Sequence, residues 1–209
     1  MKDVELNYSE LLYLNADKYV PSPGFLQNSE ELPGGKKLSI VKLGNLEAEA
    51  AFAYLYFNGY IDLEIKTKKI LGFIPKKTLI STKKSNGLDL TSLEKSIYNI
   101  SEGTEISTIL YRLIGEECAI PWAVVVRVAK KSLVNKEFLI EEKITKKIIV
   151  SYIVYKYHLN AKKNVDFKDE IVEMDEKLKE FSKKDFYKQL IKGIDSGIAS
   201  QKEKPDTSE

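Results

Sequence analysis

Residues 121–142 read PWAVVVRVAKKSLVNKEFLIEE, and residues 47–64 read EAEAAFAYLYFNGYIDLE. In each stretch an apolar helical pattern ends at a polar turn and passes directly into a short β-prone segment. Leu55 and Leu133 take equivalent positions in the two stretches, 78 residues apart. A core helix followed by the first strand of a β-hairpin is the second half of a winged helix. The two stretches therefore predict a pair of winged-helix-like units in one chain.

The helix at the start of 121–142 carries a conflicting signal, because the valines at 124–126 are β-branched and favour a strand. Pro121, however, suits the first turn of a helix. Four apolar residues also share one stripe at helical spacing: Trp122, Val126, Ala129 and Leu133. We therefore predict a helix. If residues 124–128 formed a strand instead, the two stretches would not be structurally equivalent.

Apolar spacing and turn residues predict the remaining elements. Helices are expected over 6–14, 46–57, 90–100, 106–114, 166–181 and from a capping box at Ser182 and Asp185 to Ile198. Strands are expected over 37–43, 60–65, 69–74, 77–81, 138–141 and 147–158, and a loop over 15–37. The predicted fold class is α+β, mostly helical, with winged-helix-like helices and two β-hairpins around a helical core.

The length of 209 residues suits one compact domain or two tightly joined small ones, and a single compact domain is predicted over 1–200. Its two winged-helix-like halves are expected at about 6–85 and 88–160, followed by a helical pair at about 166–199. Residues 201–209 are polar and expected to be disordered.

The composition disfavours several classes of protein. The formal net charge is only +2, and all basic residues except Arg112 and Arg127 are lysines, which argues against sequence-specific DNA reading. Cys118 is the single cysteine, so a reducing compartment is expected. The N-terminus is polar and acidic, without the features of a signal peptide, and no apolar run approaches the ~20 residues of a membrane span. We expect a cytoplasmic protein with possible peripheral membrane association.

Catalytic patterns are poorly represented. His158 is the only histidine, and it is expected to be structural, as is Cys118. The glycines at 34–35 lack the spacing of a phosphate-binding loop. We expect no enzymatic activity, no metal and no cofactor.

In the order of its elements and in several weak motifs, the chain resembles the Golgi phosphoprotein 3 family from about residue 6 to about residue 178. The motifs are L-x-x-x-E-L-L-x-L at 6–14, A-x-L-x-x-x-G-x-I-x-L-E at 53–64, a leucine-rich helix at 88–100, L-x-G-E at 113–116, and K-x-L-V-x-K with a following apolar hairpin at 131–159. The resemblance is that of a distant, prokaryotic-type member, shorter than the family at its C-terminus.

The resemblance implies a peripheral membrane adaptor that binds anionic lipid headgroups or protein tails. Eukaryotic members hold a phosphoinositide headgroup with a tryptophan and several arginines. The matching positions here are Ser39, Ala48, Ala123 and Val126, so the residues of that site are missing. The nearby cations are weak candidates for contact with a headgroup or phosphate, with simple surface charge as the alternative: Lys36, Lys37, Lys42, Arg127 and Lys130.

The family also has an apolar β-hairpin used for membrane contact or self-association. Residues Ile148, Val150, Tyr152 and Val154 fall on one face of the strand predicted at 147–158. Because both faces of this strand are apolar, either the rest of the fold covers both or one face contacts lipid or another chain.

Two other functions stay open. A winged-helix DNA-binding regulator would use Arg127, Lys130 and Lys131, which share one helical face at i, i+3 and i+4. An assembly protein, such as a homo-oligomer, would use the apolar seam of the helix at 166–181 together with the second hairpin.

Overall fold

A computed structural model describes residues 5–70, 74–87, 89–147, 151–163 and 166–202. Its described helices are α1 (Tyr8–Leu14), α2 (Ala16–Tyr19), α3 (Ile40–Phe57), α4 (Ser92–Ile100), α5 (Ile106–Ile114), α6 (Pro121–Asn135), α7 (Lys168–Phe181) and α8 (Tyr187–Ala199). Its described strands are β1 (Ser29–Glu31), β2 (Lys37–Ser39), β3 (Ile61–Ile70), β4 (Ile74–Lys83), β5 (Glu102–Glu105), β6 (Leu139–Lys147) and β7 (Ser151–Leu159). The fold is α+β and mostly helical, as predicted.

Helix α3 is the centre of the core, and α1, α4, α6 and α8 pack around it. Four of its alanines are fully buried, and their small side chains let neighbouring helices approach closely: Ala48, Ala50, Ala51 and Ala53. Gly44 serves the same purpose, because a Cβ there would lie 3.0 Å from the Cβ of Trp122 on α6. The Ala-rich composition that predicts a helix therefore also determines how tightly α6 packs.

The valine-rich stretch is helical, which confirms the prediction for α6. Val125 and Val126 are fully buried, as are Ala129 and Leu133 one and two turns later. Burial of this stripe against α3 outweighs the modest preference of β-branched residues for strands.

Both predicted helix-to-strand junctions are present, and they are built alike. In the first, the backbone N–H of Tyr60 donates to the carbonyl of Leu55; in the second, Phe138 donates to Leu133 in the same way. The residue just before each of these donors has a left-handed backbone: Gly59 has φ +70° and Glu137 has φ +64°. This is a helix end of the Schellman type, repeated at the predicted spacing.

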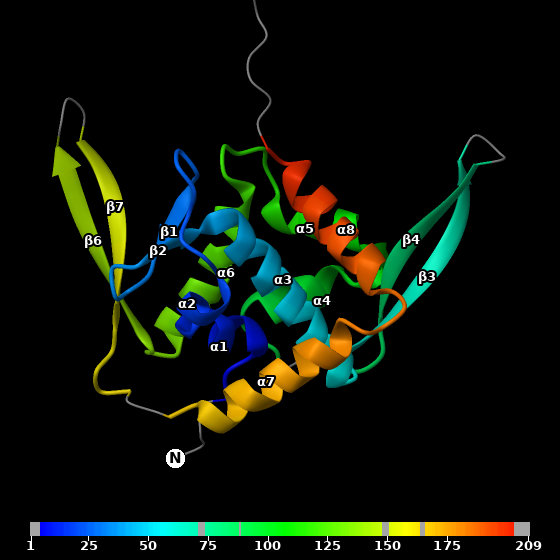
Figure 1. Ribbon diagram of the computed structural model, residues 1–209, viewed down its shortest axis with the longest axis horizontal. Coiled ribbons are helices and arrows are strands. Elements are labelled where there is room, and N and C mark those ends of the chain that lie inside the picture. Colours follow the sequence, from blue (N-terminus) through cyan, green and yellow to red (C-terminus); the bar gives the residue numbers. More distant parts are fainter. Residues whose placement is uncertain (1–4, 71–73, 88, 148–150, 164–165, 203–209) are drawn as a thin grey trace, which may run out of the picture.

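The sheets are small and antiparallel. β3 pairs with β4 from Ile61 opposite Lys83 to Ile70 opposite Ile74, and β5 adds a third strand beside β4. β6 pairs with β7 from Leu139 opposite Leu159 to Lys147 opposite Ser151, and β1 pairs with β2. Figure 1 shows the two long hairpins at opposite ends of the molecule, with the helices between them and the outer ends of both hairpins toward the top of the view.

The C-terminal helices close the core from two sides. Phe181 at the end of α7 is fully buried, and its ring lies 5.6 Å from the ring of Tyr56 on α3. α8 packs on α5 through Gly197, where a Cβ would lie only 2.6 Å from the carbonyl oxygen of Ser107. Only a residue without a side chain permits this approach.

Several sequence-based predictions were wrong in detail. The segment 37–43 contains a strand only to Ser39, and α3 begins at Ile40, because Ile40 and Leu43 are buried on its core-facing side. The predicted loop 15–37 contains α2 and β1. The strands predicted at 60–65, 69–74 and 77–81 are two long strands whose hydrogen bonds continue beyond the core, and β5 was not predicted.

Two C-terminal predictions were also wrong. The expected capping box is absent, because α8 begins at Tyr187 and the Ser182 hydroxyl instead donates to the carbonyl of Lys179. Gln201 is not part of a disordered tail: it is buried, and its Nε2 donates to the carbonyl of Tyr111. The rest of the predicted tail, 203–209, lies outside the described residues.

Candidate functional site

Lysines are concentrated in the outer halves of the two long hairpins. Residues 66–77 contain five lysines and no aspartate or glutamate, and residues 143–156 contain four lysines and no acid. The acids of the paired strands lie nearer the hairpin bases: Asp62, Glu64, Glu141 and Glu142. Glu142 is directly opposite Lys156, so this lysine marks the inner limit of the cationic part of β6–β7. These nine lysines carry +9 and the whole chain carries +2, so the remainder of the molecule carries a formal charge of −7. Positive charge is thus separated from the body of the protein.

Most of these lysines are open to solvent. Exposed side chains belong to Lys66, Lys76, Lys77, Lys143, Lys146, Lys147 and Lys156. Lys66 lies 3.7 Å from Glu64, but both side chains are more than half exposed, so solvent screens this pair. The outer halves therefore present cationic groups that an anionic partner can reach.

Hairpin β6–β7 also exposes apolar side chains. Ile153 and Tyr155 are 49% and 50% exposed, and their partners across the hairpin are Thr145 and Lys143. Since residues opposite each other in an antiparallel pair share a face, this face mixes apolar and cationic groups.

The apolar face predicted from the sequence is only partly described. Val154 is half-buried and lies beside the β1–β2 loop. Tyr152 lies on β7 opposite Lys146, while Ile148 and Val150 fall outside the described residues. The exposed apolar groups that the structure does describe are on the opposite face of β7.

A buried ion pair fixes the base of hairpin β6–β7. Lys130 Nζ on α6 lies 2.7 Å from Glu30 Oε1 on β1, and both side chains are mostly buried. The same ammonium group lies 4.4 Å from the ring centroid of Tyr157 on β7. The Tyr13 hydroxyl donates to Glu30 at 3.2 Å. These contacts join β1, α6 and β7 and hold the hairpin against the core.

The five cations proposed from the sequence do not form one site. Lys130 is engaged by Glu30, and Lys36 lies 3.7 Å from Asp17 at the surface. The other three are exposed: Lys37, Lys42 and Arg127. Of the positions that match the family's headgroup site, Ser39, Ala48 and Val126 are buried, and Ala123 is partly buried against the core.

Three glutamates lie fully inside the protein, which their sequence context did not predict. Glu10 on α1 accepts hydrogen bonds from the Ser132 hydroxyl at 2.5 Å and Lys136 Nζ at 2.7 Å. Glu94 on α4 accepts from the backbone N–H and the hydroxyl of Ser9. Burial, and then the negative charge of Glu10, raises the pKa of Glu94 to about 7.

Glu47 on α3 is the exception among these acids, because neither carboxyl oxygen has a hydrogen-bond partner among the described residues. Burial raises its pKa well above the usual range, and the nearby charge of Glu30 adds to the effect. Burial therefore favours the neutral form of this carboxyl, because an unpaired buried charge is costly. It lies on the same stripe as Leu43 and Ala51, so its helical spacing was a signal that could have placed it in the core.

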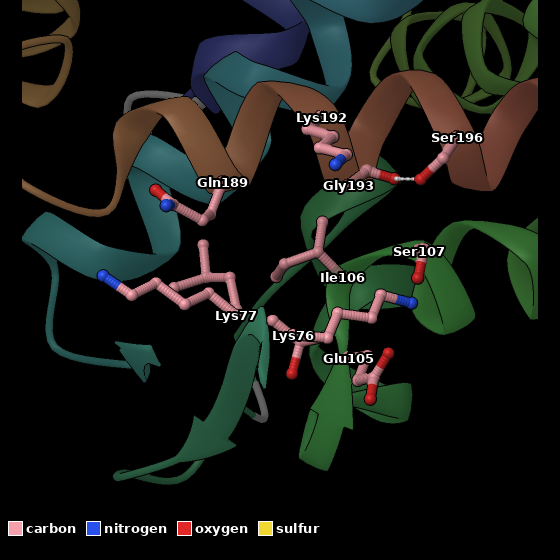
Figure 2. Close-up of a pocket in the computed structure, with 11 residues that line it drawn as sticks. Lys76, Lys77, Glu105, Ile106, Ser107, Gln189, Lys192, Gly193 and Ser196 are labelled. Atoms are coloured by element: carbon pink, nitrogen blue, oxygen red, sulfur yellow. Dashed lines mark hydrogen bonds between the residues drawn. The ribbon is translucent and has the colours of Figure 1, made fainter. Parts of the chain in front are cut away.

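A partly enclosed pocket of about 170 Å³ lies at the foot of hairpin β3–β4. It is bounded by β4, the first turn of α5 and α8, and Leu79 and Ile106 form its apolar part. Figure 2 shows Lys192 reaching toward it from α8, and Lys76 and Lys77 extending to opposite sides from β4. Three lysines and Glu105 are its charged residues, so its lining carries a formal charge of +2.

The hairpin lysines were missed because a single lysine in a strand has no distinctive signal. The signal that could have been used is the absence of acids over 66–77 and 143–156. It indicates a cationic surface only once both segments are known to form projecting hairpins.

Comparison with protein-family models, curated proteins and solved structures finds no match for this chain. Within the described part of the chain, no helix is both long and apolar enough to cross a bilayer. No group of three His, Cys, Asp or Glu residues is arranged to hold a metal ion in that part either.

Proposed function

We propose that this protein is a non-catalytic peripheral membrane protein or adaptor of the Golgi phosphoprotein 3 type, which binds anionic lipid surfaces through the outer halves of hairpins β3–β4 and β6–β7. The observation that carries the proposal is the separation of nine lysines onto these two projections, away from a body of opposite charge. Lysines close to an anionic leaflet contribute roughly 1 kcal/mol each. Because the outer ends of both hairpins lie toward one side of the molecule (Figure 1), one flat surface can meet both.

The sequence at and between the outer ends of the paired strands supports a lipid partner. Residues 70–74 read ILGFI and 148–150 read IIV, so each group of lysines flanks an apolar segment. Exposed Ile153 and Tyr155 add to the apolar character of the second hairpin. Apolar residues bordered by cations suit the boundary between headgroups and acyl chains. Nucleic acid would account for the lysines but not for the exposed apolar residues beside them.

The geometry of α6 gives less support to DNA binding. Val125 and Val126, at the start of a would-be recognition helix, are in the core, and Lys130 is already paired with Glu30. A recognition helix needs its N-terminal side chains free to reach base edges.

Co-sedimentation with vesicles tests the proposal. We expect binding to phosphatidylcholine vesicles containing phosphatidylserine and little binding to phosphatidylcholine alone. Replacing two hairpin lysines, Lys146→Gln with Lys147→Gln, should weaken binding about thirtyfold, because two contributions of roughly 1 kcal/mol are lost. The matched control is Lys179→Gln with Lys183→Gln, at and beyond the end of α7, which Figure 1 shows on the side away from the hairpin ends.

Equal binding to both kinds of vesicle would contradict the proposal, as would equal losses in the two double variants. Binding to DNA at low salt without binding to vesicles would favour the nucleic-acid alternative instead. A mass above 23.8 kDa in solution without any vesicle binding would favour an assembly protein.

A further inference from the structure

We propose that the pocket between β4, α5 and α8 binds a phosphate group, either on a lipid headgroup or on a small soluble molecule. Its charged residues are Lys76, Lys77, Lys192 and Glu105, so it favours an anion. The lysines come from two elements far apart in the sequence, and the fold brings them to one pocket (Figure 2). The site lies apart from Ser39, Ala48, Ala123 and Val126, none of which lines it.

The lining also offers groups that donate hydrogen bonds to phosphate oxygens. Hydroxyls are present on Thr78, Ser107 and Ser196. The Ser196 hydroxyl donates to the carbonyl of Gly193 at 3.3 Å and the Thr78 hydroxyl to the carbonyl of Lys66 at 3.5 Å, so among the described residues Ser107 has the hydroxyl that is left to donate to a ligand. The pocket also borders the first turn of α5, a nine-residue helix to which no side chain provides a cap hydrogen bond. Its first amides add positive potential to that of the lysines.

Gln189 also lines the pocket, and its Oε1 is buried and has no hydrogen-bond partner among the described residues. Figure 2 shows its amide on the same side as Lys77, away from Ser107. A buried amide oxygen without a partner is costly. A phosphate oxygen is itself an acceptor and does not satisfy it in this orientation. A half-turn of the amide exchanges its oxygen and nitrogen, so the same side chain can present an N–H to a phosphate oxygen.

The pocket is the right size for this chemistry. A volume of about 170 Å³ holds several water-sized groups, so a phosphate with a short attached group fits. The apolar floor formed by Leu79 and Ile106 suits the carbon part of such a ligand rather than the phosphate itself. Phosphate oxygens are therefore expected at the polar side, near Lys76, Lys192 and Ser107.

Titration with inorganic phosphate, followed by two-dimensional amide NMR on the full chain, tests the site. We expect saturable shifts at Ser107, Gly193 and Ser196 with a dissociation constant on the order of 1 mM. The double variant Lys76→Gln with Lys192→Gln should weaken binding by at least about tenfold, since charge-assisted hydrogen bonds are lost. Both lysines are exposed, so the variant should fold. The control Lys179→Gln, on α7 outside the pocket and the hairpins, should bind phosphate as the unchanged protein does.

Absence of saturable shifts, or equal binding by the double variant, would overturn the inference, and membrane binding through Lys146 and Lys147 would be unaffected by that result. A second comparison identifies the source of the phosphate. If the unchanged protein prefers phosphatidic acid over phosphatidylglycerol vesicles and the double variant loses this preference, the phosphate is lipid-borne. If phosphate binding is lost and the lipid preference does not change, the ligand is a soluble phosphate compound.

Discussion

Glu94 should make the protein less stable as the pH rises toward neutrality. Its carboxyl is fully buried and has a pKa of about 7 in the folded protein, against 4.5 for the unfolded chain. Below pH 4.5 the group is protonated in both states, and its stabilising contribution is fully present. Between these two values only the unfolded chain releases the proton. The free energy of unfolding therefore falls by about 1.4 kcal/mol per pH unit, or about 3 kcal/mol in total.

The variant Glu94→Gln removes this titration and keeps a side chain of the same shape. Urea denaturation of both proteins between about pH 5 and about pH 8 gives the comparison. The variant should gain stability relative to the unchanged protein as the pH rises, by about 3 kcal/mol across the range. The exposed Glu176→Gln on α7 is the control and should show no such trend. A difference between the Glu94→Gln and unchanged curves that varies by less than about 0.5 kcal/mol would refute the reasoning.

Two further substitutions should each raise the free energy of unfolding, measured by urea denaturation at neutral pH. Glu47→Met should stabilise the protein by about 1–3 kcal/mol, because it removes two buried oxygens without partners among the described residues; a loss of stability would show that Glu47 has a role in the folded state. Glu137→Gly should stabilise by about 1 kcal/mol, because its φ of +64° is strained for a residue with a Cβ. Gly59→Ala, at the matching junction, should lower the free energy of unfolding by a similar amount. A destabilising Glu137→Gly or a stabilising Gly59→Ala would contradict the shared backbone geometry of the two junctions.

The apolar helical core of this protein could be predicted well from its sequence, whereas its three buried glutamates were not predicted. The stripe through Val126, Ala129 and Leu133 indicates a core helix although its valines favour strands, and the two helix-to-strand junctions are visible as a repeat in the amino-acid order alone. These features are predictable because burial imposes a period on the sequence. In the outer half of β3–β4 the core buries none of the described side chains, so apolar residues do not recur at a regular spacing. The two long strands were therefore predicted as three short ones.

Segments whose apolar residues fit both helical and strand spacing were also predicted wrongly. In the stretch 37–43, alternation predicts a strand, yet Ile40 and Leu43 also have helical spacing, and contact with the rest of the core decides between them. The candidate site was harder still to predict. Lys76 and Lys192 are 116 residues apart, and only the packing of α8 beside β4 brings them to one pocket.

The separation of charge between hairpins and body has a kinetic consequence. A molecule with a cationic end on each of two arms and an anionic trunk experiences a torque in the field of any polyanionic surface. Within about one Debye length, 8–10 Å at physiological salt, that torque turns the arms to face the surface before any contact is made. Encounters should therefore be pre-aligned, and their rate should fall steeply as ionic strength rises.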